Sequence, residues 1–250
     1  MAPVFDLLAN SRSPEEARTV LKQGSMAAWE AARVLDVDPP AEVLAIHHDL
    51  RAGLQQLATD LSQFGDQVES MELCAAPSIL ATVSNAPAVS SLRTVREALG
   101  SGRLGATYQW GAFLPENTAL PERRLADGHL VDSVRRTGTG ELKVENDSES
   151  DGVLKLVQDG KPIVSVYVGT GSNATVTNID DGTYDVFYTS GIDWDDQLET
   201  FTRSCRFQRF EITAEFTTTS TQYTIWTIDI QPKDGGNIRT AEVPAESFPR

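Results

Sequence analysis

The chain is poor in the residues that most catalytic and metal sites use. Its 250 residues include only two cysteines, three histidines and three methionines, and aromatic residues make up 7%. The cysteines, Cys74 and Cys205, have neither the spacing of a zinc knuckle nor that of a redox pair. They are either two separately buried thiols or, in an oxidising compartment, a disulfide between domains. The composition gives no reason to expect a metal or a cofactor.

Long apolar runs and net positive charge are also missing. No stretch of about 18 uninterrupted apolar residues occurs, so we expect no membrane-spanning helix. The formal net charge is −15, and residues 138–250 carry 9 basic against 19 acidic side chains. A protein that binds phosphates must bring the opposite charge to them. We therefore exclude nucleic acid and anionic lipid as partners.

A secretory signal is absent from the first residues as written. The stretch MAPVFDLLANSRSPEEA lacks a basic start and a long apolar segment. As sequenced, the protein is expected in the cytoplasm. If an export segment was removed, we expect it to be secreted or in the cell envelope.

Helical signals fill the first hundred residues. Ser13, Pro14 and Glu16 supply an N-cap, a first-turn proline and the acid of a capping box. These three residues predict a helix over about 14–35.

A second helix is expected after Pro40. Its apolar residues recur three and four apart and form a stripe of about seven turns: Val43, Leu50, Leu54, Leu57, Leu61, Phe64 and Val68. His47 fills the gap in this stripe, so we expect His47 to be partly buried and His48 to face outward, both in ordinary packing. A third helical region covers 79–99. Short connections favour a bundle of three or four helices over 1–102.

From residue 140 the apolar period changes from 3.6 to 2. Seven short strands separated by turn residues are typical of a two-sheet sandwich, here over 138–250. The strand-like segments are GELKVEN, GVLKLVQ, PIVSVYV, NATVTNI, GTYDVFYT, a run over about 199–211, and QYTIWTIDI. Residues 103–137 are expected to form a connector that packs on one or both domains.

One spacing specifies the sandwich further. Asp180, Gly182 and Tyr184 have the D-x-G-x-Y spacing of a tyrosine corner, in which the phenol reaches back to a backbone carbonyl. Val186 stands where an immunoglobulin domain has a cysteine, so packing must replace the disulfide. The predicted fold class is α+β and multidomain: an N-terminal helical bundle followed by a C-terminal immunoglobulin-like antiparallel β-sandwich.

The segment ENDSESDGVLKL, residues 145–156, resembles the start of a calcium loop. Counting from Asp147, however, the ninth position is Lys155 and the twelfth is Gln158, where an EF-hand needs an oxygen ligand and a bidentate glutamate. A strand continues directly after the loop, whereas an EF-hand would continue as a helix. We therefore predict a turn between two strands.

A second acidic cluster is the sequence's best candidate for a binding site. Its carboxylates could converge on calcium, and its indole could stack on a sugar or fill a gap between sheets. The alternative is a solvated loop with the indole in the core. The candidate residues are Asp193, Trp194, Asp195 and Asp196.

The sequence contains no recognised catalytic motif. His129 has Asp127 and Asp132 nearby in sequence and is followed by Ser133, but no nucleophile elbow, HExxH motif, phosphate loop or dinucleotide fingerprint is present. The run FTRSCRFQRF is expected to place five residues on one strand face, with its arginines paired to neighbouring carboxylates: Phe201, Arg203, Cys205, Phe207 and Arg209.

An ordered set of segments resembles a group of uncharacterised actinobacterial proteins: YQWGAFLP, RRLADGHLV, GTGELKVEND, DDGTYDVFYTSGIDWD, FTRSCRFQRF and GGNIRTAEVPAESFP. The resemblance covers about 43–249. It implies a helical N-terminal region before an all-β C-terminal domain, and an envelope or extracellular setting, because many members look like secreted proteins or lipoproteins. It supplies no catalytic or ligand residue.

Together these observations favour a non-catalytic interaction or structural protein that meets a protein partner or associates with itself. One alternative is a carbohydrate-binding or cell-wall-binding module of the envelope, with Trp194 as the stacking residue. The other is a hydrolase that uses His129 with a nearby Asp or Ser.

Overall fold

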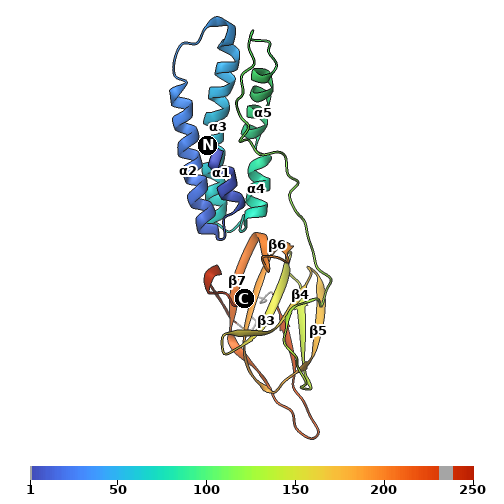
Figure 1. Cartoon of the computed structure of the whole chain (residues 1–250). Helices are drawn as coiled ribbons and strands as arrows, with labels where there is room; N and C mark the ends of the chain where they lie inside the picture. The colour runs from blue at the N-terminus through green and yellow to red at the C-terminus, as the bar shows by residue number, and fades with distance from the viewer. Residues whose placement is uncertain (1, 231–238) are drawn as a thin grey trace. The chain divides into compact units, whose positions relative to one another are not determined.

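The computed structural model describes residues 2–230 and 239–250 (Figure 1). The chain is α+β and divides into two compact units, Met1–Pro121 and Glu122–Arg250. The segment expected to be a connector is shared between them, since residues 103–121 belong to the first unit and residues 122–137 to the second. None of the helices in the described part of the chain is long and apolar enough to cross a membrane.

Five α-helices form the described part of the first unit: α1 (Ala2–Ala9), α2 (Pro14–Val34), α3 (Leu44–Glu69), α4 (Ala76–Ser84) and α5 (Pro87–Gly100). The expected cap of α2 is present, because the Glu16 amide donates to Ser13 Oγ at 3.1 Å. His47 is half-buried and His48 is exposed, as expected. Helix α1 was not predicted, since its eight residues are too few to show a helical period.

Small residues let neighbouring helices of the first unit approach closely. The buried residues of α2 are Ala17, Val20, Leu21, Gly24, Ala28 and Ala32. A Cβ added at Gly24 would lie 2.8 Å from Val4 Cγ1, and one added at Gly53 of α3 would lie 2.7 Å from Leu92 Cδ2. The aromatic part of residues 103–121 completes this core, because Phe113 stacks on Phe5 with ring centroids 6.3 Å apart.

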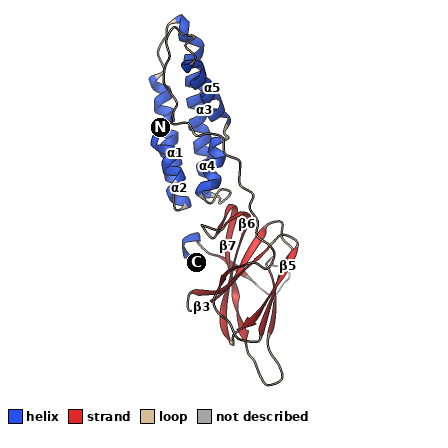
Figure 2. Ribbon diagram, turned by 45° about the vertical axis from the view of Figure 1, so that its right-hand side comes forward, coloured by secondary structure: helices blue, strands red, loops and turns tan. Residues whose placement is uncertain are grey.

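The second unit consists of strands in two sheets (Figure 2). The strands are β1 (Leu130–Ser133), β2 (Gly140–Asn146), β3 (Asp151–Gln158), β4 (Lys161–Val168), β5 (Ser172–Ile179), β6 (Gly182–Asp195), β7 (Thr200–Phe216), β8 (Ile225–Asp229) and β9 (Thr240–Glu242). One sheet has the order β1-β4-β3-β6-β7-β9 and the other β5-β2-β8. All seven predicted strands are present, and their apolar side chains form one core cluster that draws on both sheets, an arrangement consistent with a sandwich.

Two features of the sheets differ from the sequence prediction. β2 and β8 pair in parallel, with Glu141 opposite Ile225, so the second sheet is not wholly antiparallel. The short edge strands β1 and β9 were not predicted, because three or four residues carry too little alternation.

The tyrosine corner is confirmed. Tyr184 Oη donates to the Asp180 carbonyl at 3.0 Å, and the Tyr184 ring meets Phe216 edge-on at 5.7 Å. The corner lies where the chain passes from β5 in one sheet to β6 in the other. Val186 is fully buried, so packing occupies the position of the missing cysteine.

Part of the shared face predicted on β7 is present, since Phe207 contacts the Phe248 ring and Arg209 lies over the Phe187 ring, which also contacts Phe248. Phe201 and Cys205 are buried, but Phe210 is also buried and Arg209 is exposed. The pairing of β6 with β7 shifts register twice, and Ser204 has a φ of 51°. A bulge or register shift changes locally how side chains alternate between the two faces of a strand. The expected ion pairing does occur, since Arg209 Nη2 lies 2.7 Å from an Asp185 oxygen.

Two glycines of α3 test how closely the helices pack. Gly53→Ala and Gly65→Ala gain the same helix propensity, about 1 kcal/mol. An added Cβ meets Leu92 only at Gly53, and nothing lies within 4 Å of it at Gly65. We expect urea unfolding to show Gly65→Ala stabilised and Gly53→Ala less stable than Gly65→Ala by at least about 1 kcal/mol. Equal stabilities would contradict close packing at Gly53.

Candidate functional site

Two adjacent arginines, Arg123 and Arg124, join the segment before β1 to the ends of β3 and β6. Arg123 Nε and Nη2 donate to the two carboxylate oxygens of Asp193 at 2.8 and 2.7 Å, and Nη1 donates to Asp195 at 2.7 Å. The Arg123 amide also donates to Asp193 at 2.8 Å. In return, the Trp194 amide donates to the Arg123 carbonyl at 3.0 Å. We call this set of bonds the Arg123 clasp.

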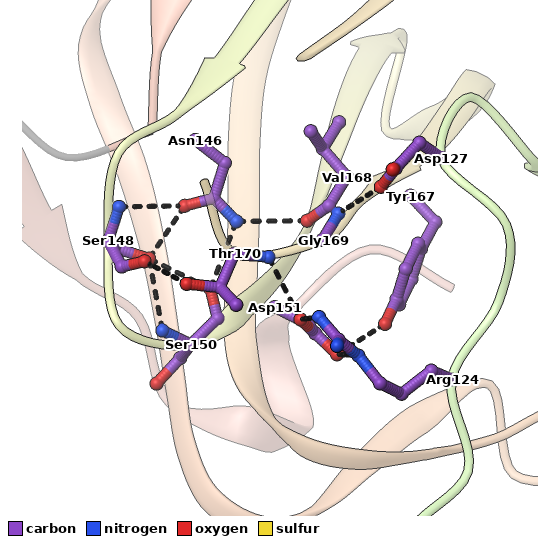
Figure 3. A network of polar contacts seen from close by, with 10 residues as sticks. All are labelled: Arg124, Asp127, Asn146, Ser148, Ser150, Asp151, Tyr167, Val168, Gly169 and Thr170. Atoms are coloured by element: carbon purple, nitrogen blue, oxygen red, sulfur yellow. Dashed lines mark hydrogen bonds and ion pairs between the residues drawn. The ribbon is translucent and has the colours of Figure 1, made fainter. Parts of the chain in front are cut away.

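Arg124 makes a second clasp with Asp151 (Figure 3). Arg124 Nε donates to Asp151 at 2.7 Å and its Nη2 donates to the other carboxylate oxygen. Tyr167 Oη and the Thr170 amide donate to the same carboxylate, the amide at 3.0 Å. Every acceptor oxygen of this buried acid therefore has a donor inside the protein.

The clasps hold carboxylates in their charged form. Burial by itself would raise the pKa values of Asp151 and Asp193, but the hydrogen bonds from the arginines and from Tyr167 or Thr202 outweigh it and lower both pKa values. Burial and the bond to Asp151 raise the pKa of the Tyr167 phenol. These acids are therefore ionised at neutral pH and the phenol is protonated, which is the arrangement of a structural ion pair.

An aromatic cluster lies beside the clasps. Trp194 is 1% exposed, and its ring centroid is 5.0 Å from that of Phe201 and 6.4 Å from that of Tyr167. The indole Nε1 donates to Asp196 at 2.8 Å. In this structure the ring has no face open to a sugar.

The candidate residues identified in the sequence therefore make contacts within the second unit. Residues 191–195 belong to β6 and are not a solvated loop. Asp193 and Asp195 bind Arg123, Trp194 is in the core, and Asp196 binds the indole. Within residues 2–230 and 239–250, no group of three or more His, Cys, Asp or Glu side chains could hold a metal ion.

A turn connects β2 with β3, as the sequence predicted for ENDSESDG. Asn146 Nδ2 donates to the Ser150 and Val168 carbonyls, both at 2.9 Å, and its Oδ1 accepts from the Ser148 amide at 3.1 Å (Figure 3). Asn146 is fully buried. This buried amide fixes the path of residues 147–150 between the two sheets.

A cavity of about 290 Å³ opens between the clasps. It is lined by Glu122, Arg123, Arg124, Glu149, Ser150, Asp151, Thr170, Gly191, Ile192 and Asp193. The side chains of Arg123 and Arg124 are 45% and 56% exposed, but each is neutralised by a buried carboxylate. With Glu122 and Glu149 added, the lining has excess negative charge and does not suit an anion.

The side chains near His129 are engaged elsewhere. Asp127 accepts from the Gly169 amide at 2.7 Å, and Asp132 accepts from Ser165 Oγ at 3.0 Å. Ser133 Oγ accepts from Arg136 at 2.9 Å. His129 itself is exposed. These bonds direct the neighbouring carboxylates to structural partners.

The first unit has exposed apolar side chains that the sequence analysis did not single out. Five large apolar side chains between α2 and the start of α3 are 43–76% exposed, and we call them the α2 surface: Met26, Trp29, Val34, Val37 and Leu44. Met26 and Trp29 lie three positions apart in α2 and are both exposed, whereas Gly24, Ala28 and Ala32 of the same helix are buried. The sequence did contain these apolar residues, but none of the predicted helix faces accounted for them.

Comparison of the chain with protein-family models, curated proteins and solved structures finds no match in any of the three.

The lowered pKa of Asp193 gives its clasp a pH dependence. A depressed folded-state pKa contributes stability above the unfolded value, about 3.9, and this stability is lost as pH falls through the folded value. We expect Asp193→Asn to lose about 2–3 kcal/mol of unfolding free energy at neutral pH, and this loss to shrink between about pH 5 and pH 2. Urea unfolding over this range measures both.

The matched control is Asp196→Asn, which keeps an oxygen acceptor for the indole and leaves both clasps intact. It should cost less than Asp193→Asn at neutral pH. A loss for Asp193→Asn that stays the same in acid would contradict the clasp as described.

Proposed function

We propose that the chain is a non-catalytic binding protein whose α2 surface meets a protein partner. The observation that carries this proposal is the exposure of Met26, Trp29, Val34, Val37 and Leu44 within one short stretch of the first unit. Single exposed apolar residues are ordinary, whereas a group of them marks an interaction surface.

The composition of the α2 surface suits a protein partner. Trp29 is 51% exposed, and tryptophan is among the residues that most often dominate binding energy at interfaces. Met26 beside it has a flexible side chain that adapts to different partners. Lys22, Glu30 and Arg33 are exposed nearby and supply a polar rim.

The paired charges of the second unit also support this proposal. Asp151 and Asp193 are held by arginines, and these contacts stabilise the fold without leaving a reactive group. We propose that this unit is an immunoglobulin-like sandwich and that the first unit is a helical bundle, each acting as a rigid support. Trp194 is 1% exposed, which favours a packing role for its ring over stacking on a sugar.

A site-specific crosslinking experiment tests the proposal. A photoreactive amino acid at Lys22, which is exposed beside Met26, should give a crosslinked adduct in cells that express the protein. The same amino acid at Leu198, an exposed apolar position in the second unit, is the control and should give none.

Trp29→Ser combined with Met26→Ser should reduce the Lys22 adduct at least about tenfold, because hot-spot residues each contribute about 2 kcal/mol. Circular dichroism should show the helices unchanged, since both side chains point to solvent. An adduct that persists in this double variant, or that forms equally at Leu198, would contradict the proposal.

A further inference from the structure

The outer face of the six-stranded sheet has a second, smaller core. Leu154 and Leu156 of β3 belong to the core between the sheets, and Lys155 between them points to the opposite face. Lys155 is nevertheless 1% exposed. Its Nζ lies 3.3 Å from Asp132 of β1, so the buried ammonium is paired on one side.

An aromatic ring covers Lys155 on the other side. The Phe248 ring centroid is 5.8 Å from Lys155 Nζ, 5.9 Å from the Phe187 ring and 5.2 Å from the Phe207 ring. Phe187 lies opposite Lys155 in the pairing of β3 with β6. Two rings and a cation therefore form a pocket, the Phe248 pocket, that is filled by a third ring from the C-terminal segment.

Main-chain pairing brings Phe248 to this pocket. β9 pairs with β7 through three residues, and the Val243 amide then donates to the Phe207 carbonyl at 2.9 Å. Among residues 239–250, Phe248 is the one side chain that is buried. The segment is thus held by a short added strand and one aromatic anchor, which is how many domains bind extended peptides.

A segment held in this way can exchange between molecules. Three paired residues and a single anchor make few contacts, so the segment belongs to the low-stability part of the fold. Releasing it would expose Phe187 and Phe207 and uncover the ammonium of Lys155. The same segment from another copy restores every one of these contacts, because the sequences are identical.

We propose that the Phe248 pocket is a recognition site for an aromatic residue on an extended segment, and that the C-terminal segment of a second copy binds there in trans. In a single molecule the segment occupies its own pocket at high effective concentration. Exchange therefore links two copies when the protein is concentrated. This site lies in the second unit and does not depend on the α2 surface.

A peptide-binding experiment with the full chain tests the pocket. The Phe248→Ala variant loses its own anchor, so it should bind a fluorescent peptide of residues 239–250, measured by anisotropy. The wild-type protein should bind this peptide at least about tenfold more weakly, because its own segment competes. A peptide with alanine in place of phenylalanine should not bind the variant.

Two further measurements test the role of Phe207 in the pocket and the association of two copies. Adding Phe207→Ala to Phe248→Ala should abolish peptide binding, with circular dichroism confirming that the β-signal is kept. Sedimentation of the wild type at rising concentration should show a dimer that Phe248→Ala lacks and that Trp29→Ser keeps.

The proposal is overturned by a folded Phe248→Ala variant that does not bind the peptide, or that binds the alanine peptide equally well. A wild type that stays monomeric at the concentrations where the peptide binds removes the second copy as occupant and overturns it as well. Loss of the dimer in Trp29→Ser would instead assign association to the α2 surface.

Discussion

The second unit depends on one ion pair, in which Arg123 holds the buried carboxylate of Asp193. The Asp193 side chain is completely buried, and a carboxylate in that position is costly unless every oxygen is paired. The Arg123 side chain donates two hydrogen bonds to this carboxylate, and the Arg123 backbone amide donates a third. The Thr202 hydroxyl donates the fourth. Because the arginine lies in the segment before β1, this pair fixes the start of the second unit to the end of β6.

This constraint commits the cluster of acids at the end of β6 to contacts within the protein. Asp193 has a φ of 62°, a conformation that aspartate tolerates better than most residues. The acids near Trp194 are committed to an arginine and to an indole, and Asp151 is committed to Arg124 and Tyr167. The acids that make these contacts therefore stabilise the fold.

The sequence predicted the features that depend on residues close together along the chain. The cap at Ser13, the alternation of the seven strands and the tyrosine corner at Tyr184 are each encoded within a few residues. The clasps could not be predicted in the same way, because Arg123 and Asp193 are 70 positions apart. The parallel pairing of β2 with β8 is also nonlocal. The irregularity in β7 includes a positive φ at Ser204, for which serine gives no signal in the sequence.

Hydrogen exchange at the end of β6 tests most directly whether the Arg123 clasp organises the second unit. Replacing Arg123 by methionine keeps a side chain of similar length but leaves Asp193 buried without its charge partner, a loss of about 3–5 kcal/mol. Amide exchange in residues 191–196 should then rise by at least about a hundredfold, while exchange in the first unit stays as it was. Unchanged protection of residues 191–196 would contradict the account.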